Sequence, residues 1–292
     1  MVIDEDHFWL NINKDAGFSS AKIVAIIKKT LKVKKIGHAG TLDPIATGVL
    51  PIAVNRATKT IDYIQSEEKE YYAEIKWGEK RDTDDIEGKI ESISKKRPTN
   101  LEILSVIVKF LGQIEQVPPE FSAIKVSGKR SYQLARDGYK PKLKSRLISI
   151  KEIRLHYNNQ NQAGFFIKCS KGTYIRSFAR DLAENIGSLG YIKTLKRLKV
   201  GNFSYDQTIS LDKLKILSKF EYTNFKLRTI DILGSVPNIE VDHHIAVKIS
   251  YGQKVSLPIE SYNNRFVNLV SNGKLIAIMD IKIDKIIRFI NQ

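Results

Sequence analysis

The 292-residue chain has little of several features that would point to particular protein classes. It has a single cysteine, Cys169, so it can form neither an intramolecular disulfide nor a metal site built from several cysteines. No apolar run reaches the roughly 18 residues of a membrane-spanning helix. The first residues, Met-Val-Ile-Asp-Glu-Asp, lack the positive charge that opens a secretory signal. These deficits favour a cytoplasmic protein without a membrane segment.

Acidic residues are also few, because 32 Asp and Glu stand against 48 Lys and Arg. The resulting net charge of +16 and pI near 9.6 are typical of a protein that binds a polyanion, and nucleic acid is the leading candidate. Charge alone does not separate RNA from DNA or from an anionic membrane surface, and a basic surface can also serve solubility alone. The length predicts about two domains.

The stretch from Gly37 to Ala53 reads Gly-His-Ala-Gly-Thr-Leu-Asp-Pro-Ile-Ala-Thr-Gly-Val-Leu-Pro-Ile-Ala. It places an imidazole, His38, and a carboxylate, Asp43, among glycines and then enters an apolar run typical of a buried strand. Glycine lets the backbone approach a ligand closely, and Pro44 fixes the backbone just after the carboxylate. The pattern predicts that a polar loop presents Asp43 at a defined point. The alternative is that Asp43 caps a helix beginning at Pro44.

This stretch resembles the signature Gly-His-Ala-Gly-Thr-Leu-Asp-Pro-x-Ala-Thr-Gly-Val-Leu of the bacterial tRNA pseudouridine synthase B family, which isomerises uridine 55 in the T-loop of tRNA. The resemblance implies that Asp43 is the catalytic nucleophile and that no cofactor, metal or protein partner is required. It also implies a pseudouridine synthase fold of the α+β class, with a mixed, mostly antiparallel central sheet flanked by helices. Because the target base must be flipped out of the folded T-loop, His38 is a candidate to fill the vacated stack.

Two flanking segments extend the resemblance. Lys14-Asp-Ala-Gly-Phe-Ser-Ser follows a predicted strand over 8–13 and resembles the family's first motif, although Asp15 replaces its usual proline. Lys14 is thereby a candidate for substrate binding, and the alternative is a solvated surface lysine. Tyr71 lies in a later strand, predicted over 69–78 from alternation. By resemblance Tyr71 stacks on the uracil and removes the final proton, whereas the alternative is a cross-strand aromatic contact.

An acidic segment, residues 79–87, follows this strand. Its spacing does not fit a calcium-binding loop, because Ile86 takes the fifth position counted from Asp82 and glycine comes seventh instead of sixth. We therefore expect no metal there. The resemblance implies instead that Asp85 belongs to a charge network with the active-site arginine, and the alternative places Asp85 in an exposed acidic turn.

The segment from 125 to 146 contains eight basic residues and one acidic residue, with two tyrosines interleaved. Such a composition suits the gripping of RNA, because cations neutralise phosphates and aromatic rings stack on unpaired bases. The resemblance implies that residues 120–147 form a mobile thumb over the T-loop, with RNA contacts from Lys125, Lys129 and Arg130. A solvated charged hairpin is the alternative.

A third motif, Cys169-Ser-Lys-Gly-Thr-Tyr-Ile-Arg, precedes a helix predicted over 177–186. Tyr174 and Arg176 are expected two residues apart on one face of a strand, so that both point into one site. The resemblance implies that Arg176 is catalytic and that Tyr174 and Leu195 contact the target nucleotide. The alternatives are a structural ion pair for Arg176 and core packing for Leu195.

Periodicity predicts two further elements. One is an amphipathic helix over 99–111 whose apolar face contains Leu101, Leu104, Ile107, Val108 and Leu111. The other is a small β-rich domain, because apolar and polar residues alternate from Val241 around turns at Gly252, Asn263-Asn264 and Asn272-Gly273. We therefore expect a catalytic domain over 1–230 and, by the resemblance, a small PUA-like RNA-binding domain over 236–292.

The resemblance, carried by four ordered motifs between residues 8 and 210, implies a tRNA pseudouridine-55 synthase whose partner is the T-arm stem-loop of tRNA. One alternative is a relative that modifies another RNA within a guide complex. Another is a non-catalytic RNA-binding module, which would have no need to keep Asp43, Tyr71 and Arg176 together.

Overall fold

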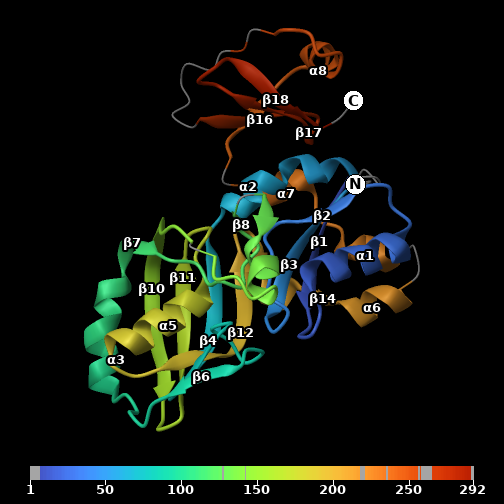
Figure 1. Ribbon diagram of the computed structural model, residues 1–292. Helices are drawn as coiled ribbons and strands as arrows, with labels where there is room; N and C mark the ends of the chain where they lie inside the picture. Colours follow the sequence, from blue (N-terminus) through green and yellow to red (C-terminus); the bar gives the residue numbers. More distant parts are fainter. Residues whose placement is uncertain are drawn as a thin grey trace.

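The computed structural model describes residues 7–126, 128–141, 143–217, 221–234, 236–255, 257 and 265–290. A large twisted sheet with helices packed against it forms most of the molecule, and a small four-stranded sheet stands at one end (Figure 1). The α+β architecture with a separate C-terminal β unit confirms the fold class expected from the sequence.

The large sheet has ten strands, and most of its neighbours are antiparallel. Among the described strands of the large sheet, only the pairs β1 with β14 and β3 with β12 run parallel. In spatial order the main path is β14 (Ile209–Ser210), β1 (Trp9–Lys14), β3 (Thr47–Val54), β12 (Gly190–Val200), β4 (Lys69–Trp77), β11 (Gln162–Cys169), β10 (Arg146–Asn158) and β7 (Gly112–Gln116). Two strands lie off this path, β2 (Ile36–His38) beside β3 and β13 (Phe203–Ser204) beside β12.

Strand β3 is buried on both faces, as its continuous apolar sequence predicts. Leu50 and Ile52 join one hydrophobic cluster, whereas Val49 and Ala53 join another on the opposite face. The loop before β3 is therefore attached to one of the most enclosed strands of the molecule.

Helices α1, α3, α5 and α6 all contribute to the first of these clusters, so they cover the same face of the large sheet. Ser19 caps α1, since its side chain accepts the Lys22 N–H. The helices and 3-10 turns are α1 (Ser20–Leu31), η1 (Asn55–Thr60), α2 (Ile61–Ser66), α3 (Asn100–Ile107), η2 (Val108–Phe110), α4 (Ser131–Arg136), α5 (Ile175–Asn185), η3 (Tyr205–Gln207), α6 (Leu211–Ile216), η4 (Glu221–Phe225), α7 (Thr229–Ile232) and α8 (His243–Ser250).

The helix expected over 99–111 is present as α3 and η2, but the face predicted to be buried was wrong. Ile107 is buried as predicted, whereas Leu101, Leu104, Val108 and Leu111 are exposed. The core is reached instead by Ile103, Val106, Ile107 and Phe110, and the Phe110 ring packs edge-on against Phe178 of α5. Because apolar residues crowd this segment, two helical faces fit its periodicity, and only the tertiary contact selects one.

Two short hairpins project from the large sheet: β5 (Glu79–Arg81) with β6 (Ile90–Ile93), and β8 (Lys125–Val126) with β9 (Lys129–Arg130). The first carries the acidic segment. The second, followed by α4, forms the segment expected to be the thumb.

The small sheet has the order β15 (Asn238–Glu240), β16 (Phe266–Ser271), β17 (Lys274–Asp280) and β18 (Lys285–Phe289). The expected turn at Asn272-Gly273 joins β16 to β17, and the expected turn at Asn263-Asn264 lies outside the described residues. The strand pattern expected directly after Val241 was wrong, because α8 begins at His243. Asp242 caps this helix by accepting the Ile245 N–H, a local signal that the alternation concealed.

The small sheet docks on helix α2. Phe266 packs edge-on against Tyr63 with ring centroids 5.5 Å apart, and Arg288 lies 3.5 Å from Asp62. A second hydrophobic cluster continues from the large sheet into β17, and a third, built by α8, β16 and β17, belongs to the small unit. None of the described helices is long and apolar enough to cross a membrane.

Candidate active site

A cavity of about 760 Å³ opens where the loop before β3, strands β4 and β12 and the segment before α5 meet. Its wall contains both polar and apolar groups, and it includes four of the residues singled out from the sequence: Asp43, Tyr71, Tyr174 and Leu195. The base of the thumb also contributes Ser122 and Ala123. The predicted residues therefore converge on one hollow although they come from distant parts of the chain.

The Asp43 loop is held by contacts on both sides of the carboxylate. Ser20 of α1 fastens Leu42, because its hydroxyl accepts the Leu42 N–H at 2.9 Å and donates to the Leu42 carbonyl at 3.1 Å. Gly48 has φ +97° and lies against the Arg197 backbone carbonyl, so a Cβ there would overlap it. From Pro44 the chain makes a single turn closed by the Ala46 N–H on the Asp43 carbonyl, so the helix-cap alternative for Asp43 was wrong.

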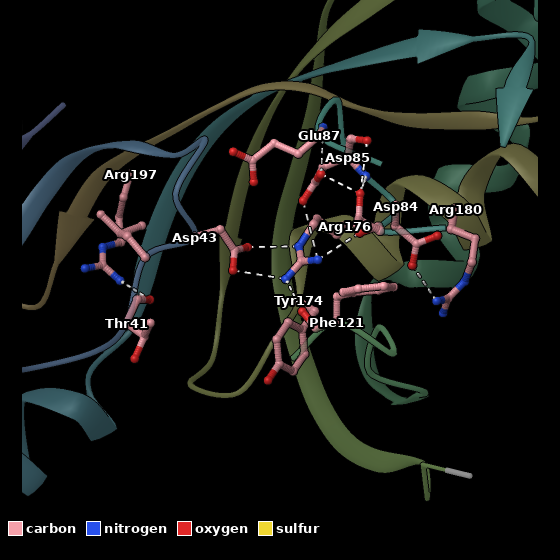
Figure 2. Close-up of polar contacts among 12 residues, drawn as sticks. Thr41, Asp43, Asp84, Asp85, Glu87, Phe121, Tyr174, Arg176, Arg180 and Arg197 are labelled. Atoms are coloured by element: carbon pink, nitrogen blue, oxygen red, sulfur yellow. Dashed lines mark hydrogen bonds and ion pairs between the residues drawn. The ribbon is translucent and has the colours of Figure 1, made fainter. Parts of the chain in front are cut away.

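Arg176 binds Asp43 through two parallel hydrogen bonds. Its Nε donates to Oδ2 at 2.9 Å and its Nη2 to Oδ1 at 3.0 Å, the bidentate geometry in which arginine holds a carboxylate most firmly (Figure 2). The Arg176 side chain is buried, and burial lowers its pKa. The negative charges of Asp43 and Asp85 outweigh this, so the pKa of Arg176 is raised. The expected contact is present, with the guanidinium held in its charged form.

Arg176 reaches this position from a helix, not from a strand. Tyr174 is the N-cap residue of α5, and the helix begins at Ile175, so the expected strand through Tyr174 and Arg176 was wrong. Gln116 of β7 fixes the turn by accepting the Tyr174 N–H at 2.8 Å and donating to the Tyr174 carbonyl at 3.1 Å. Tyr174 still lines the cavity, and the Arg146 guanidinium lies 4.5 Å from its ring centroid.

Asp85 lies on the other side of the Arg176 guanidinium, with 3.4 Å between Oδ2 and Nη1. Its remaining oxygen accepts the Thr83 hydroxyl at 2.6 Å and the Glu87 N–H at 3.0 Å. Burial raises the pKa of Asp85, while the Thr83 hydrogen bond and Arg176 oppose the shift. Asp85 is only 3% exposed, so the alternative of an exposed acidic turn was wrong.

A second ion pair lies behind the first and was missed from the sequence. Arg180 donates to Asp84 at 2.8 Å and to the Val117 carbonyl at 3.0 Å. Burial raises the pKa of Asp84 to about 6, although Arg180 opposes the shift. Arg176 and Arg180 are four residues apart and therefore share one face of α5. The four-residue spacing is visible in the sequence, but it indicates a shared face only within a helix. Arg176 was expected on a strand, so the spacing did not lead to Arg180.

The same helix face fastens the base of the thumb. Arg176 donates from Nη2 to the Phe121 carbonyl at 3.0 Å, and the Ser177 hydroxyl donates to the Val117 carbonyl at 2.8 Å. Lys125, Lys129 and Arg130 lie beyond this base and are exposed. These three basic residues lie outside the wall that the described residues form around the cavity.

Tyr71 and Leu195 face the cavity from the neighbouring strands β4 and β12, and both are largely buried. Burial raises the pKa of the Tyr71 phenol, and the nearby Arg197 guanidinium opposes the shift. Tyr72 points to the other face of the sheet, where its ring lies 6.1 Å from that of His156. The wall thus offers an apolar surface, a phenol and a carboxylate to whatever the cavity holds.

Residues 28–175 match the sequence profile described as TruB family pseudouridylate synthase (N terminal domain). The chain belongs to the TruB family. It is 41% identical over 285 residues to the tRNA pseudouridine synthase B of Rhodospirillum rubrum, covering 94% of this chain and 92% of that protein. The corresponding enzyme of Ehrlichia ruminantium is 47% identical over 211 residues, covering 72% and 71% of the two chains. These relatives confirm the resemblance found in the motifs.

Solved structures support the TruB family fold independently of sequence. A chain of the Cbf5-Nop10-Gar1 complex superimposes with a TM-score of 0.75 over 94% of this chain and 78% of its own length, at 21% identity. At that identity the likeness concerns the fold alone, and it confirms the pseudouridine synthase fold.

Lys14 and His38, two further residues predicted from the resemblance, also lie outside the cavity wall. Lys14 is fully buried, and its ammonium donates to the carbonyls of Asp15, Phe18 and Pro44, so the solvated alternative was wrong. Burial lowers the pKa of Lys14 to about 8. His38 lies on β2, opposite Ile52 of β3. Contact of either residue with substrate stays a prediction.

No cluster of three or more His, Cys, Asp or Glu side chains suited to a metal ion occurs within the described ranges. The carboxylates near the cavity instead face guanidinium groups. The groups that this TruB family site offers for chemistry are therefore the oriented carboxylate of Asp43, the phenol of Tyr71 and the guanidinium groups of Arg176 and Arg197.

Proposed function

We propose that this protein converts uridine 55 in the T-loop of tRNA to pseudouridine. The observation that carries the proposal is the Asp43 carboxylate, held bidentately by Arg176 at the wall of a cavity that also contains Tyr71 and Leu195. Its TruB family relatives are named for the synthesis of pseudouridine in tRNA. The substrate base would enter the cavity after flipping out of the T-loop.

The reaction is an isomerisation. The N1–C1′ bond breaks, the uracil turns within the cavity, a C5–C1′ bond forms, the C5 proton leaves and N1 takes up a proton. Asp43 would act at the junction of sugar and base, either by bonding to the nucleotide or by removing a sugar proton. Arg176 fixes the orientation of the Asp43 carboxylate through its two hydrogen bonds.

Tyr71 and Leu195 supply the remaining surface. We assign Tyr71 to stacking on the uracil and to accepting the C5 proton, and Leu195 to packing against the base while it turns. No redox step or transferred group is needed, so the proposed reaction uses no cofactor.

The RNA partner is the T-arm stem-loop. Its phosphates would be bound by the exposed cations of the thumb, Lys125, Lys129 and Arg130, and the small C-terminal sheet would act as the PUA-like RNA-binding unit. Both assignments agree with the net charge of +16. We expect the enzyme to work in the cytoplasm, where tRNA is processed, and to require no protein partner.

Tritium release tests this function directly, because the hydrogen at C5 of uridine is lost when pseudouridine forms. A T-arm stem-loop labelled at C5 of uridine 55 should release its tritium with multiple turnovers. The matched control carries the label only in other uridines and should release none. Tight binding without release would indicate a non-catalytic module, and release only from an unrelated RNA would indicate a relative with another substrate.

A further inference from the structure

Arg197 is a fully buried arginine at the cavity wall whose charge is not neutralised by an acid. It is 1% exposed, and among the described residues no carboxylate lies within ion-pair distance of it. Its donors go instead to the backbone carbonyls of Val49 at 2.8 Å, Gly40 at 3.0 Å and Thr41 at 3.4 Å. A charged group enclosed in this way is costly, and its contacts should show why it is there.

Two of these carbonyls belong to the Asp43 loop. Gly40 and Thr41 precede Asp43 by three and two residues, and Val49 lies in the strand that follows. Arg197 therefore ties the beginning of the loop to the strand at its end. Figure 2 shows Arg197 with Thr41 on one side of Asp43 and Arg176 on the other.

Arg197 is also the cross-strand partner of Tyr71, since the two residues are paired in the register of β12 and β4. Both side chains line the cavity, and the positive charge of Arg197 lies close enough to Tyr71 to oppose the rise in the pKa of its phenol. Tyr71 otherwise faces Cys169 of β11 and Asp43 of the loop, and both of these would disfavour its ionised form. Around Arg197, the titratable neighbours besides Tyr71 and Asp43 are Lys14 on β1, His38 on β2 and Lys69 on β4.

We propose that Arg197 is a positioning residue that couples the two sides of the reaction, by fixing the backbone in front of Asp43 and by stabilising the ionised phenol of Tyr71. The inference rests on the proposed function, because it gives Tyr71 the C5 proton. Burial makes it harder for a phenol to lose its proton, and a positive charge on the neighbouring strand makes it easier again. Arginine suits both tasks, because its planar fork can address several acceptors at once.

Two substitutions of Arg197 separate the effect of its positive charge from the effect of its planar, forked guanidinium group. Arg197→Gln removes both, so kcat should fall at least about tenfold, and the rise of kcat with pH that reports Tyr71 should move upward by about one to three pH units. Arg197→Lys keeps the charge and loses the fork, so kcat should fall while the pH profile stays in place. Single-turnover tritium release from the labelled stem-loop at a series of pH values gives both quantities.

Lys14→Gln is the matched control. Lys14 also fastens the Asp43 loop, through the Pro44 carbonyl, but it makes no contact with Tyr71. It should lower kcat without moving the profile. An unmoved profile in Arg197→Gln, an equal movement in Lys14→Gln, or full activity of Arg197→Lys would each overturn the proposal. If Arg197→Gln does not fold, the result with Arg197→Lys still decides the positioning role.

A second readout does not require turnover. The absorbance of tyrosinate, taken as the difference between the chain with Tyr71 and Tyr71→Phe, reports ionisation of this one phenol. That difference should appear at higher pH when Arg197 is replaced by glutamine, and no movement would refute the coupling. If the T-arm stem-loop releases no tritium with the unaltered enzyme, the proposed function fails, and the absorbance alone judges the contact between Arg197 and Tyr71.

Discussion

The two arginines beside Asp43 are equally enclosed but differently paired. Arg176 is 3% exposed and faces the carboxylates of Asp43 and Asp85, whereas Arg197 is 1% exposed and faces backbone carbonyls and a phenol. Carboxylates neutralise a guanidinium and can be oriented by it, while carbonyls leave its charge available to a neighbour. One side of the cavity therefore orients the reactive acid, and the other side shapes the loop that carries it.

Removing the acid between the two arginines should have the largest effect. Asp43→Asn keeps the shape of the side chain and removes its charge, so turnover should fall by at least about a thousandfold. RNA affinity should stay within a few-fold of the original, because Asp43 contributes no positive charge to phosphate binding. Tritium release and a filter-binding titration with the same stem-loop measure the two quantities. Substantial activity in a preparation free of unaltered enzyme would assign the chemistry to another residue.

The next largest loss of activity is expected from a substitution of Arg176, the arginine that binds the Asp43 carboxylate. Arg176→Lys keeps the charge but loses the fork that reaches Asp43, Asp85 and the Phe121 carbonyl together, so kcat should fall about a hundredfold. Arg197→Lys should cost less activity, because it loses the hydrogen bonds to backbone carbonyls but keeps a positive charge beside Tyr71. Equal losses for the two lysine variants would remove the distinction between the two sides.

The sequence predicted the elements of the site better than their local conformation. Asp43, Tyr71, Tyr174 and Leu195 were found through motifs and do meet at one cavity, and β3 was predicted because its apolar run admits no exposed face. The strand expected at Tyr174 and Arg176 was wrong because a motif fixes residue spacing but not backbone shape. In the structure, Gln116, from 58 residues earlier in the chain, satisfies both backbone groups of Tyr174 and turns the chain into α5.

Residues whose role depends only on long-range contacts could not be identified from the sequence. Arg197 looks like one cation in the basic run that ends at Lys199, and only the pairing of β12 with β4 and β3 shows that it points inward. Asp84 and Asp85 are adjacent in the sequence, yet they bind different arginines of α5. The sequence of the turn does not predict which arginine each carboxylate binds. The buried face of α3 was mispredicted for the same reason, because it too depends on a long-range contact. Two faces of the helix are apolar, and only the packing against α5 determines which one is buried.

A smaller effect is expected from the second carboxylate on the Arg176 side. Asp85→Asn keeps one oxygen to accept from the Thr83 hydroxyl and the Glu87 N–H, but puts an uncharged NH2 group where Oδ2 faces Arg176, so kcat should fall about tenfold. RNA affinity should not change, because Asp85 is buried away from solvent. Combined with Arg176→Lys, the substitution should add less than it does alone, since both act on one network. Simple additivity of the two losses would place Asp85 outside that network.

The smallest effect on activity is expected at Asp84, which binds Arg180 and lies one layer behind the reacting groups. Its influence should appear in stability instead. The pKa of Asp84 is about 6 in the folded protein against an ordinary value of 3.8, so the folded state retains this proton to higher pH than the unfolded state does. As the pH rises from about 4 to about 6, the folded protein therefore loses stability, by up to about 3 kcal/mol.

Asp84→Asn has no such proton to lose. Its unfolding free energy relative to the unaltered protein should therefore rise between pH 4.5 and 7, whichever of the two is more stable at the lower pH. Urea unfolding at several pH values measures this difference. Asp212→Asn serves as the control, because Asp212 lies on α6 with its side chain 86% exposed, and its curve should stay parallel to that of the unaltered protein. A parallel curve for Asp84→Asn would mean that Arg180 compensates the burial of Asp84 completely, and the ion pair behind the site would then contribute no pH dependence to the fold.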